Sequence, residues 1–427
     1  MADTQRLETI PGVGRTRRWS STKARLPFNF LVAVMLAQVG ACLAFSPLLQ
    51  ILLPLKAAGI DPSHKGVLLS HILLAGATTA AVANLTVGVL SDRTRSRFGR
   101  RRPWMAAGLV GTLGAYLLLA KAASTVQLFV AIIAFQLLFN TFFSAFAAAV
   151  AERTPSACRG MVYSMLALGP PVGSIGGLLL VGDLAHGPIA ACAELSLVIL
   201  LALSPFTLLF RDSPAPPQRF AQSGEPSAPA GPWTRDFLLA VGGRVATVTA
   251  QATLQGYAFF ALQDRWANLH DAPTGLRPEQ ALANLLIIVT GANLLTGLIC
   301  GWWSDRMARR KPFVILSAVL SGLALAACGL AGDWWTVVVA LIVFGCASGC
   351  YNAIGSALLV QVLPSLNHAG RDLGLANLGN TLPQALAPLV AALVMHDHPS
   401  AYRTLFLLAG VLAASGGLAI LPVKSGR

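Results

Sequence analysis

The sequence predicts an all-α membrane protein with twelve transmembrane helices in two six-helix bundles. Three observations predict it: few charged residues, recurring apolar stretches of about 20 residues, and a motif present once in each half. Charged residues make up 11% of the 427 residues and hydrophobic residues 55%. Ordinary globular proteins carry roughly 25% charged residues, so lipid is the expected solvent for most of this chain.

Each apolar stretch is expected to be a helix, because a helix satisfies its backbone polar groups within its own segment. About 20 helical residues cross the ~30 Å hydrocarbon layer. Six spans are predicted in the first half, at 27–49, 66–90, 104–120, 126–150, 160–182 and 188–210. Six more are predicted at 237–262, 280–303, 313–331, 334–358, 373–395 and 402–423.

The segment between the two sets is polar and proline-rich, which predicts a flexible cytoplasmic linker at 211–236. The predicted organisation is a tail at 1–26, a bundle at 27–210, the linker, a bundle at 237–423 and a tail at 424–427. The first 26 residues are polar and basic without an apolar core, so they do not resemble a cleaved signal peptide.

Lysine and arginine lie mainly on one side of the predicted bundle. Of the 31, the tails, the linker and the even-numbered loops hold 24, the opposite loops hold 6, and Arg244 lies inside a span. The positive-inside rule therefore places both termini in the cytoplasm of a multi-pass protein of the cell (cytoplasmic) membrane. The net charge of +14 is interpreted as topological, with affinity for anionic lipids and not for nucleic acid.

No sequence pattern indicates an enzyme, a cofactor or a metal site. The chain lacks a phosphate-binding GxxxxGK[ST] loop, a GxSxG or HExxH motif, and a Cys/His cluster with zinc-ligand spacing. We therefore expect a monomeric, non-enzymatic membrane protein without a cofactor.

A duplicated motif is the most specific signal. The stretch that begins at Gly88 reads GVLSDRTRSRFGRRRPW, and a second copy reads GWWSDRMARRKPF. Asp92 and Asp305 are 213 residues apart, and Arg159 and Arg371, which each adjoin a glycine, are 212 apart. Two markers with nearly one offset indicate duplication of a six-helix unit.

The first copy resembles the loop between helices two and three of the major facilitator superfamily. Its SDR…SRFGRRRP form is most similar to the glycoside/pentoside/hexuronide symporters and the sucrose-proton symporters. The second copy and the Pro155…Arg159-Gly160 element also resemble that superfamily. The resemblance implies a secondary transporter that moves a small polar solute, such as a sugar or glycoside, by alternating access with a coupling proton.

The motif residues are expected to gate the cytoplasmic side. Gly88 allows close helix approach, Asp92 can accept hydrogen bonds from a facing helix N-terminus, and the arginines can hold carboxylates or carbonyl ends. These contacts would stabilise an outward-open state. The expected gating residues are Gly88, Asp92, Arg93, Arg100, Arg101, Arg159, Asp305, Arg306 and Arg371. The alternative is that these charges only fix the topology.

Polar side chains at mid-depth should face protein or water, because an amide facing lipid is unfavourable. The expected substrate-binding residues are Gln38, Gln136, Asn140, Arg244, Gln251 and Gln384. Uncharged amides suit a neutral polar ligand, and the alternative for each is hydrogen bonding between helices. Arg244 could bind a carboxylate or phosphate of a substrate, or extend to the interface.

Glu152, Glu194 and His71 are the titratable candidates for proton coupling. Span 66–90 lacks the paired carboxylates of melibiose-type symporters, and span 126–150 lacks the acidic residue of the sucrose symporters. The coupling ion and the direction of transport therefore stay open. Two other functions also fit the scaffold: an exporter of drugs or hydrophobic metabolites, and a non-transporting membrane assembly factor.

Overall fold

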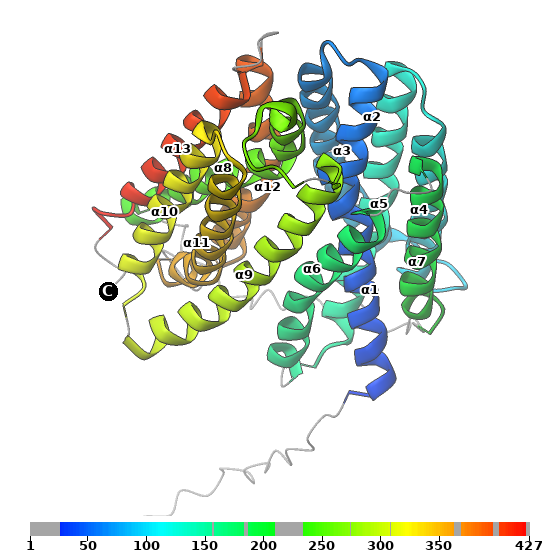
Figure 1. The fold of residues 1–427 in the computed structure, drawn as a ribbon. Coiled ribbons are helices and arrows are strands. Elements are labelled where there is room, and N and C mark those ends of the chain that lie inside the picture. Colours follow the sequence, from blue (N-terminus) through cyan, green and yellow to red (C-terminus); the bar gives the residue numbers. More distant parts are fainter. Residues whose placement is uncertain are drawn as a thin grey trace, which may run out of the picture.

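The computed structural model describes residues 26–155, 158–182, 187–209, 234–273, 275–307, 309–362, 369–395 and 401–423 (Figure 1). Within these ranges the regular secondary structure is helical, with one isolated bridge between His270 and Asp333. The tails expected at 1–26 and 424–427 and the linker expected at 211–236 lie outside the described residues, except positions 26 and 234–236.

The helices follow one another along the chain in two sets. The first half contains α1 (Phe28–Pro47), the π-helix η1 (Leu48–Leu52), α2 (Leu53–Ile60), α3 (Lys65–Arg93), α4 (Arg102–Lys121), α5 (Thr125–Arg153), α6 (Arg159–Gly182) and α7 (Gly187–Leu209). The second half contains α8 (Arg235–Arg265), the short 3₁₀ helix η4 (Trp266–Asn268), α9 (Pro278–Met307), α10 (Lys311–Leu330), α11 (Trp334–Gln361), α12 (Ala369–Val394) and α13 (Ala401–Leu418).

These helices have the lengths and composition of membrane spans. Among the described residues, eleven helical segments are long and apolar enough to cross a membrane, and α12 adds the shorter apolar stretch Gly379–Val394. The predicted all-α membrane class is therefore confirmed. Most helix ends lie within a few residues of the predicted ones, but the first span continues to Ile60 instead of ending at 49.

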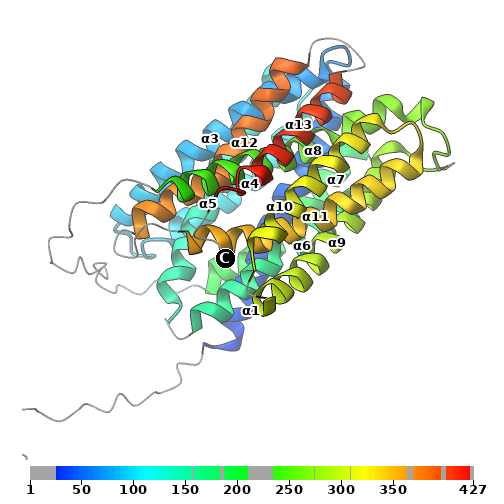
Figure 2. The same cartoon turned by 90° about the vertical axis from the view of Figure 1, so that its left-hand side faces the viewer.

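The two halves repeat one packing pattern. In the first half α1 packs on α6 and α7, α5 packs on α3 and α4, and α4 packs on α7. In the second half α8 packs on α12 and α13, α11 packs on α9 and α10, and α10 packs on α13. The halves meet where α3 contacts α12 and α6 contacts α9 (Figures 1 and 2). This arrangement is two six-helix bundles related by a pseudo-twofold axis.

Glycines allow close contact between α1 and α6 in the first half. A Cβ at Gly169 would lie 2.2 Å from the Gln38 side chain, and a Cβ at Gly173 would lie 2.4 Å from the Val39 carbonyl oxygen. Gly177, one turn further along α6, faces Pro47. The spacing of four residues places these glycines on one face of α6, so that α1 can approach closely.

The connections between helices define the two ends of the molecule. The basic end carries the connections at 94–101 and 308–310, and the far end carries the connection at 61–64. The main apolar core runs through both halves between these ends, and a smaller cluster around Phe237, Val314 and Tyr351 lies in the second half.

Candidate functional site

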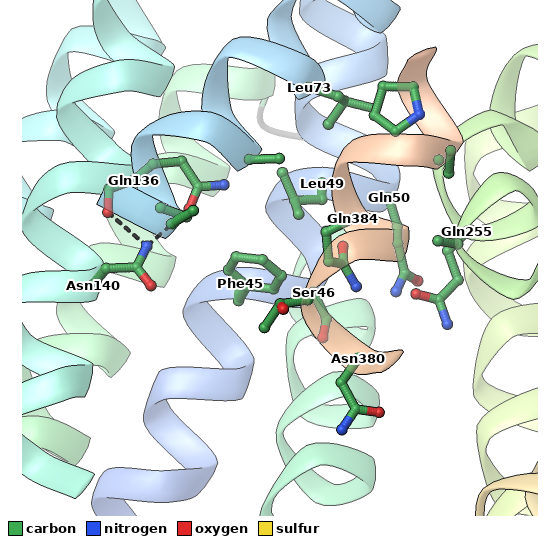
Figure 3. A pocket seen from close by; sticks show the side chains of 18 of the residues that line it. Phe45, Ser46, Leu49, Gln50, Leu73, Gln136, Asn140, Gln255, Asn380 and Gln384 are labelled. Atoms are coloured by element: carbon green, nitrogen blue, oxygen red, sulfur yellow. Dashed lines mark hydrogen bonds between the residues drawn. The ribbon is translucent and has the colours of Figure 1, made fainter. Parts of the chain in front are cut away.

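A cavity of about 320 Å³ lies at mid-depth between the two halves (Figure 3). Helices α1, η1, α3 and α5 of the first half and α8 and α12 of the second half contribute its walls. The polar lining residues are Ser46, Gln50, Asn84, Gln136, Asn140, Gln255, Tyr257, Asn380, Thr381 and Gln384. No charged side chain is among the described residues that line the cavity.

On the first-half side, three amides form a chain from α3 to α5. Asn84 Nδ2 donates to Asn140 Oδ1 at 2.9 Å, and Asn140 Nδ2 donates to the Gln136 carbonyl oxygen and Oε1 at 2.7 and 3.1 Å. These bonds fix the orientation of Asn140. They leave an acceptor on Asn84 and a donor on Gln136 for groups inside the cavity.

On the opposite side, Gln255 comes from α8 and Gln384 from α12, and both are exposed to the cavity. Figure 3 shows their side chains directed toward the same part of the cavity as that of Gln50. Asn380 lies about one turn from Gln384 and is bonded on its side away from the cavity. Arg244 Nε and Nη2 donate to its Oδ1 at 3.0 and 2.8 Å. The Asn380 amide nitrogen is therefore the group available to the cavity.

Three of the six expected binding residues line this cavity: Gln136, Asn140 and Gln384. The other three do not. Gln38 is 9% exposed and packs over Gly169, with its Nε2 3.8 Å from Cys42 Sγ.

Gln251 and Arg244 are also buried away from the cavity lining. Gln251 is 5% exposed, and its Oε1 accepts from Asn352 Nδ2 at 3.3 Å. Arg244 is 8% exposed and reaches the cavity only through Asn380. Neither side chain lines the cavity, because both point toward other helices of the second half.

Seven of the ten polar lining residues are not among the binding residues expected from the sequence: Ser46, Gln50, Asn84, Gln255, Tyr257, Asn380 and Thr381. Gln50 lies beyond the predicted end of the first span, on η1. Gln255 lies one helical turn after Gln251, so the i, i+4 spacing was the available signal. Asn84 and Ser46 carried no signal that distinguished them from amides and hydroxyls between helices.

The cavity is closed at the far end by contacts between the halves. Lys65 on α3 forms an ion pair with Asp264 and donates to Gln263 Oε1 at 3.0 Å, both at the end of α8. Closer to the cavity, the hydroxyls of Ser70 and Tyr257 share a 2.7 Å hydrogen bond. These contacts join α3 of the first half to α8 of the second half.

At the basic end, the duplicated motif is bonded inside its own half. The buried Arg101 donates to Ser91, to Asp92 and to Glu152 Oε1, the last at 2.8 Å, and so joins α3 to α5. Arg100 Nη2 also donates to Glu152, at 2.8 Å. Asp92 therefore accepts from Arg101, the residue before α4 of its own half, in this conformation.

The last basic residue of each motif copy has the same role. Arg102 donates to the carbonyl oxygens of Thr207 and Leu208 at the end of α7, both at 3.1 Å. Lys311 donates to the carbonyl oxygens of Leu421 and Val423 after α13. Corresponding cations thus stabilise the carboxyl-terminal end of the sixth span in both halves.

The other expected gating residues have few contacts in this conformation. A Cβ at Gly88 would meet only Ser144 Oγ, at 3.9 Å, so the close helix approach expected there is absent. Arg93 and Arg306 are exposed, and Arg306 lies 5.5 Å from the Trp302 ring centroid. The side chains of Asp305, Arg159 and Arg371 lie outside the described part of the structure.

None of the three coupling candidates lines the cavity. Glu152 belongs to the arginine network at the basic end, while Glu194 and His71 are exposed on α7 and α3. Within the described ranges, no group of three or more His, Cys, Asp or Glu side chains could hold a metal ion.

Known proteins share both the sequence pattern and the fold. The family model of the Major Facilitator Superfamily matches residues 28–265 and 274–426. A stretch of 144 residues is 28% identical to MFS transporter asaE of Aspergillus flavus, which covers 34% of this chain and 32% of that protein. A stretch of 53 residues is 46% identical to an uncharacterized symporter of Synechocystis, over 12% of this chain and 9% of that protein. The chain thus matches only a minor part of the length of either relative.

Solved structures match over nearly the full length. A bacterial homolog of the human lysosomal transporter Spinster, in an inward-facing and occupied conformation, has a TM-score of 0.69 at 12% identity over 93% of this chain and 96% of that one. The nucleoside transporter NupG has a TM-score of 0.70 at 14% identity over 92% and 99%. At these identities the likeness concerns the fold. Together with the family match, it shows that the chain belongs to the major facilitator superfamily of membrane transporters.

Proposed function

We propose that this protein carries a small hydroxylated solute, of the sugar or glycoside class, across the cytoplasmic membrane by alternating access. The observation that carries the proposal is the cavity between the halves, whose described polar lining consists of amides and hydroxyls. Amides offer donors and acceptors together, which matches the hydrogen-bonding pattern of hydroxyl groups. A volume of about 320 Å³ lies at the lower end of the usual range for ligand pockets and suits a small solute.

The proposal of alternating access follows from how the halves are joined. Lys65 with Asp264 and Gln263, and Ser70 with Tyr257, join the halves at the far end, above the cavity, so this conformation corresponds to a carrier closed at that end. With both termini in the cytoplasm, as the charge distribution predicts, it is an inward-facing state. Because the halves are pseudo-symmetric, rocking one against the other would open the far end and bring the basic ends together.

The gating role that we propose for the motif belongs to the opposite, outward-open state. The Asp92 side chain is 59% exposed in this conformation, although Arg101 contacts it. Arg93 and Arg306 are exposed as well. These groups are free to contact the other half when the basic ends close.

We assign proton coupling in this proposal to Glu152. Among the three coupling candidates, Glu152 is the one with described ion pairs, to Arg100 and Arg101. Through Arg101 it is linked to Asp92 on α3. A pH profile of transport that is unchanged by Glu152→Gln would remove this assignment.

The test is solute exchange in proteoliposomes containing the full-length protein, with a panel of sugars and glycosides. Gln384→Leu removes an amide from the cavity, and Gln361→Leu removes an exposed amide at the end of α11 as the matched control. The loss of one hydrogen bond of about 0.5–1.5 kcal/mol predicts about 2- to 10-fold weaker exchange for Gln384→Leu. The control should exchange the solute as well as the wild type does. If no hydroxylated solute moves, or if only lipophilic cations stabilise the protein, the proposal is refuted.

A further inference from the structure

Arg244 is a buried cation in the second half for which the described residues provide no anionic partner. It is 8% exposed, and no described carboxylate forms an ion pair with it. Nε and Nη2 both donate to one neutral acceptor, Asn380 Oδ1, and Nη1 has no acceptor among the described residues. A buried charge normally has a partner of opposite charge, because burial removes its hydration.

The backbone of two helices makes room for this guanidinium. A Cβ at Gly379 of α12 would lie 3.1 Å from Arg244 Cδ, and a Cβ at Gly355 of α11 would lie 3.4 Å from Nη1. Arg244 lies nine residues after the start of α8, roughly 14 Å along the helix axis. The side chain is thus packed between helices at depth and does not extend to the interface.

A second buried donor on the same face of α8 also lacks an acceptor. Gln251 lies two turns after Arg244, and its Nε2 has no partner among the described residues. The Gln251 Oε1 is already used by Asn352, as the Asn380 Oδ1 is by Arg244. Among the described side chains, this face of the second half therefore has surplus donors and positive charge, and lacks acceptors and negative charge.

From this imbalance, which extends the proposed function, we infer that the carried solute is anionic and that its oxyanion group binds Arg244. Asn380 connects the guanidinium to the cavity, since it both lines the cavity and accepts from Arg244. An entering carboxylate or phosphate would take the place of Asn380 Oδ1 and could accept from two guanidinium nitrogens together. The hydroxyls of the same solute would contact the amides of the cavity.

The charge balance selects an anion over a neutral solute. The described lining residues of the cavity are uncharged, whereas Arg244 places a positive charge directly behind the lining residue Asn380. A neutral solute would leave this charge uncompensated, and a cationic solute would add to it. An anion supplies both the negative charge and the hydrogen-bond acceptors that the described residues lack.

The test compares thermal stabilisation of the purified full-length protein by four probes at equal ionic strength: glucose, gluconate, glucose 6-phosphate and inorganic phosphate. Arg244→Gln removes the charge, Arg244→Lys keeps it without the planar fork, and Arg277→Gln removes a charge from an exposed far-end arginine as the control. We expect an oxyanion probe to stabilise the wild type and Arg277→Gln equally. The concentration needed should rise about tenfold or more in Arg244→Gln, and by less in Arg244→Lys. Comparing gluconate with glucose 6-phosphate then distinguishes carboxylate from phosphate.

Several results would overturn the inference. One is equal stabilisation of the wild type and Arg244→Gln by the oxyanions; another is no stabilisation of the wild type by any oxyanion probe. If Arg244→Gln does not fold, Arg244→Lys with an unchanged oxyanion response decides against the inference. If glucose stabilises the protein and is exchanged, and the Arg244 variants change neither result, the inference of an anionic solute is refuted while the proposed carrier function stands. Oxyanion binding without movement of any solute would refute the carrier instead.

Discussion

Replacing Asp264 by Asn should weaken the closed far end while keeping the shape of the side chain. Three groups from the second half surround the Lys65 ammonium: the Asp264 carboxylate, Gln263 Oε1 at 3.0 Å, and the Phe260 ring with its centroid 5.1 Å away. The lysine and aspartate side chains are 17% and 28% exposed, so water screens this pair less than a surface ion pair.

The magnitude follows from the partial burial. An exposed ion pair contributes about 0.2–1 kcal/mol, and a hydrogen bond to a charged group about 1.5–3 kcal/mol. For this half-buried pair we expect a loss of about 1–2 kcal/mol, which corresponds to about 5- to 30-fold in an equilibrium constant. Lys65 and Asp264 belong to different halves, so the loss acts on the equilibrium between the closed and open far end.

The assay is thiol accessibility of Leu73→Cys in a background without the native cysteines. Leu73 lines the cavity beneath the far-end contacts, so a membrane-impermeant reagent added from that side reaches it only when the far end opens. Asp264→Asn should raise the labelling rate about 5- to 30-fold, in proportion to the open population. Ser63→Cys, in the exposed connection, should label at one rate in both proteins.

The exchanged pair, Lys65→Asp with Asp264→Lys, should return the labelling rate toward that of the parent. The reasoning is refuted if Asp264→Asn leaves the Leu73→Cys rate unchanged, or if the exchanged pair labels as fast as Asp264→Asn alone.

Three further predictions concern stability, each read from thermal unfolding in detergent. Arg101→Ala should destabilise the protein by about 2–3 kcal/mol, because this buried arginine donates to three side chains. Arg100→Ala should cost less than about 1 kcal/mol, because among the described residues Arg100 bonds to Glu152 alone, at a more exposed position. Equal losses for the two variants would contradict the network. Gly173→Ala should destabilise the protein, since the new Cβ would lie 2.4 Å from a carbonyl oxygen of α1. Gly114→Ala should be neutral or stabilising, because a Cβ there would meet nothing within 4 Å. The opposite order of stabilities would contradict the close packing of α1 on α6. Hydrogen bonds from the first turn of α11 lower the pKa of Asp333 below its ordinary 3.8. The ionised carboxylate therefore stabilises the protein fully above pH 3.8, and this stabilisation is lost as the pH falls through the lowered pKa. Asp333→Asn should abolish this part of the acid dependence of stability, and an unchanged acid profile in the variant would contradict the prediction.

The helices could be predicted from the sequence because lipid requires long, apolar, self-satisfied segments. The fourth span, predicted at 126–150, is α5 (Thr125–Arg153). The first span was the exception. Pro54 and Lys56 interrupt its apolar stretch, yet the helix continues, because Lys56 Nζ donates to the Ala120 carbonyl oxygen at the end of α4 at 2.7 Å. A partner on another helix is not visible in the local sequence.

The cavity lining could be predicted only in part, because these helices are apolar on all sides and carry little amphipathic signal. Gln136 and Gln384 line the cavity as expected, whereas Gln38 faces the glycines of α6. Which side of a span faces the cavity depends on the packing of its neighbours. The same limit applies to Arg244, whose depth was evident from its position but whose contact with Asn380 was not.

The central claim, that the two ends of the cavity open in alternation, is tested most directly by measuring both ends in one protein. Spin-label distances would be recorded between Ser63 and Arg277 at the far end, and between Arg97 and Arg306 at the basic end, positions that are all exposed. We predict that Asp264→Asn lengthens the far-end distance and shortens the basic-end distance in the same fraction of molecules. A far end that opens while the basic-end distance stays fixed, or two distances that lengthen together, would contradict the claim.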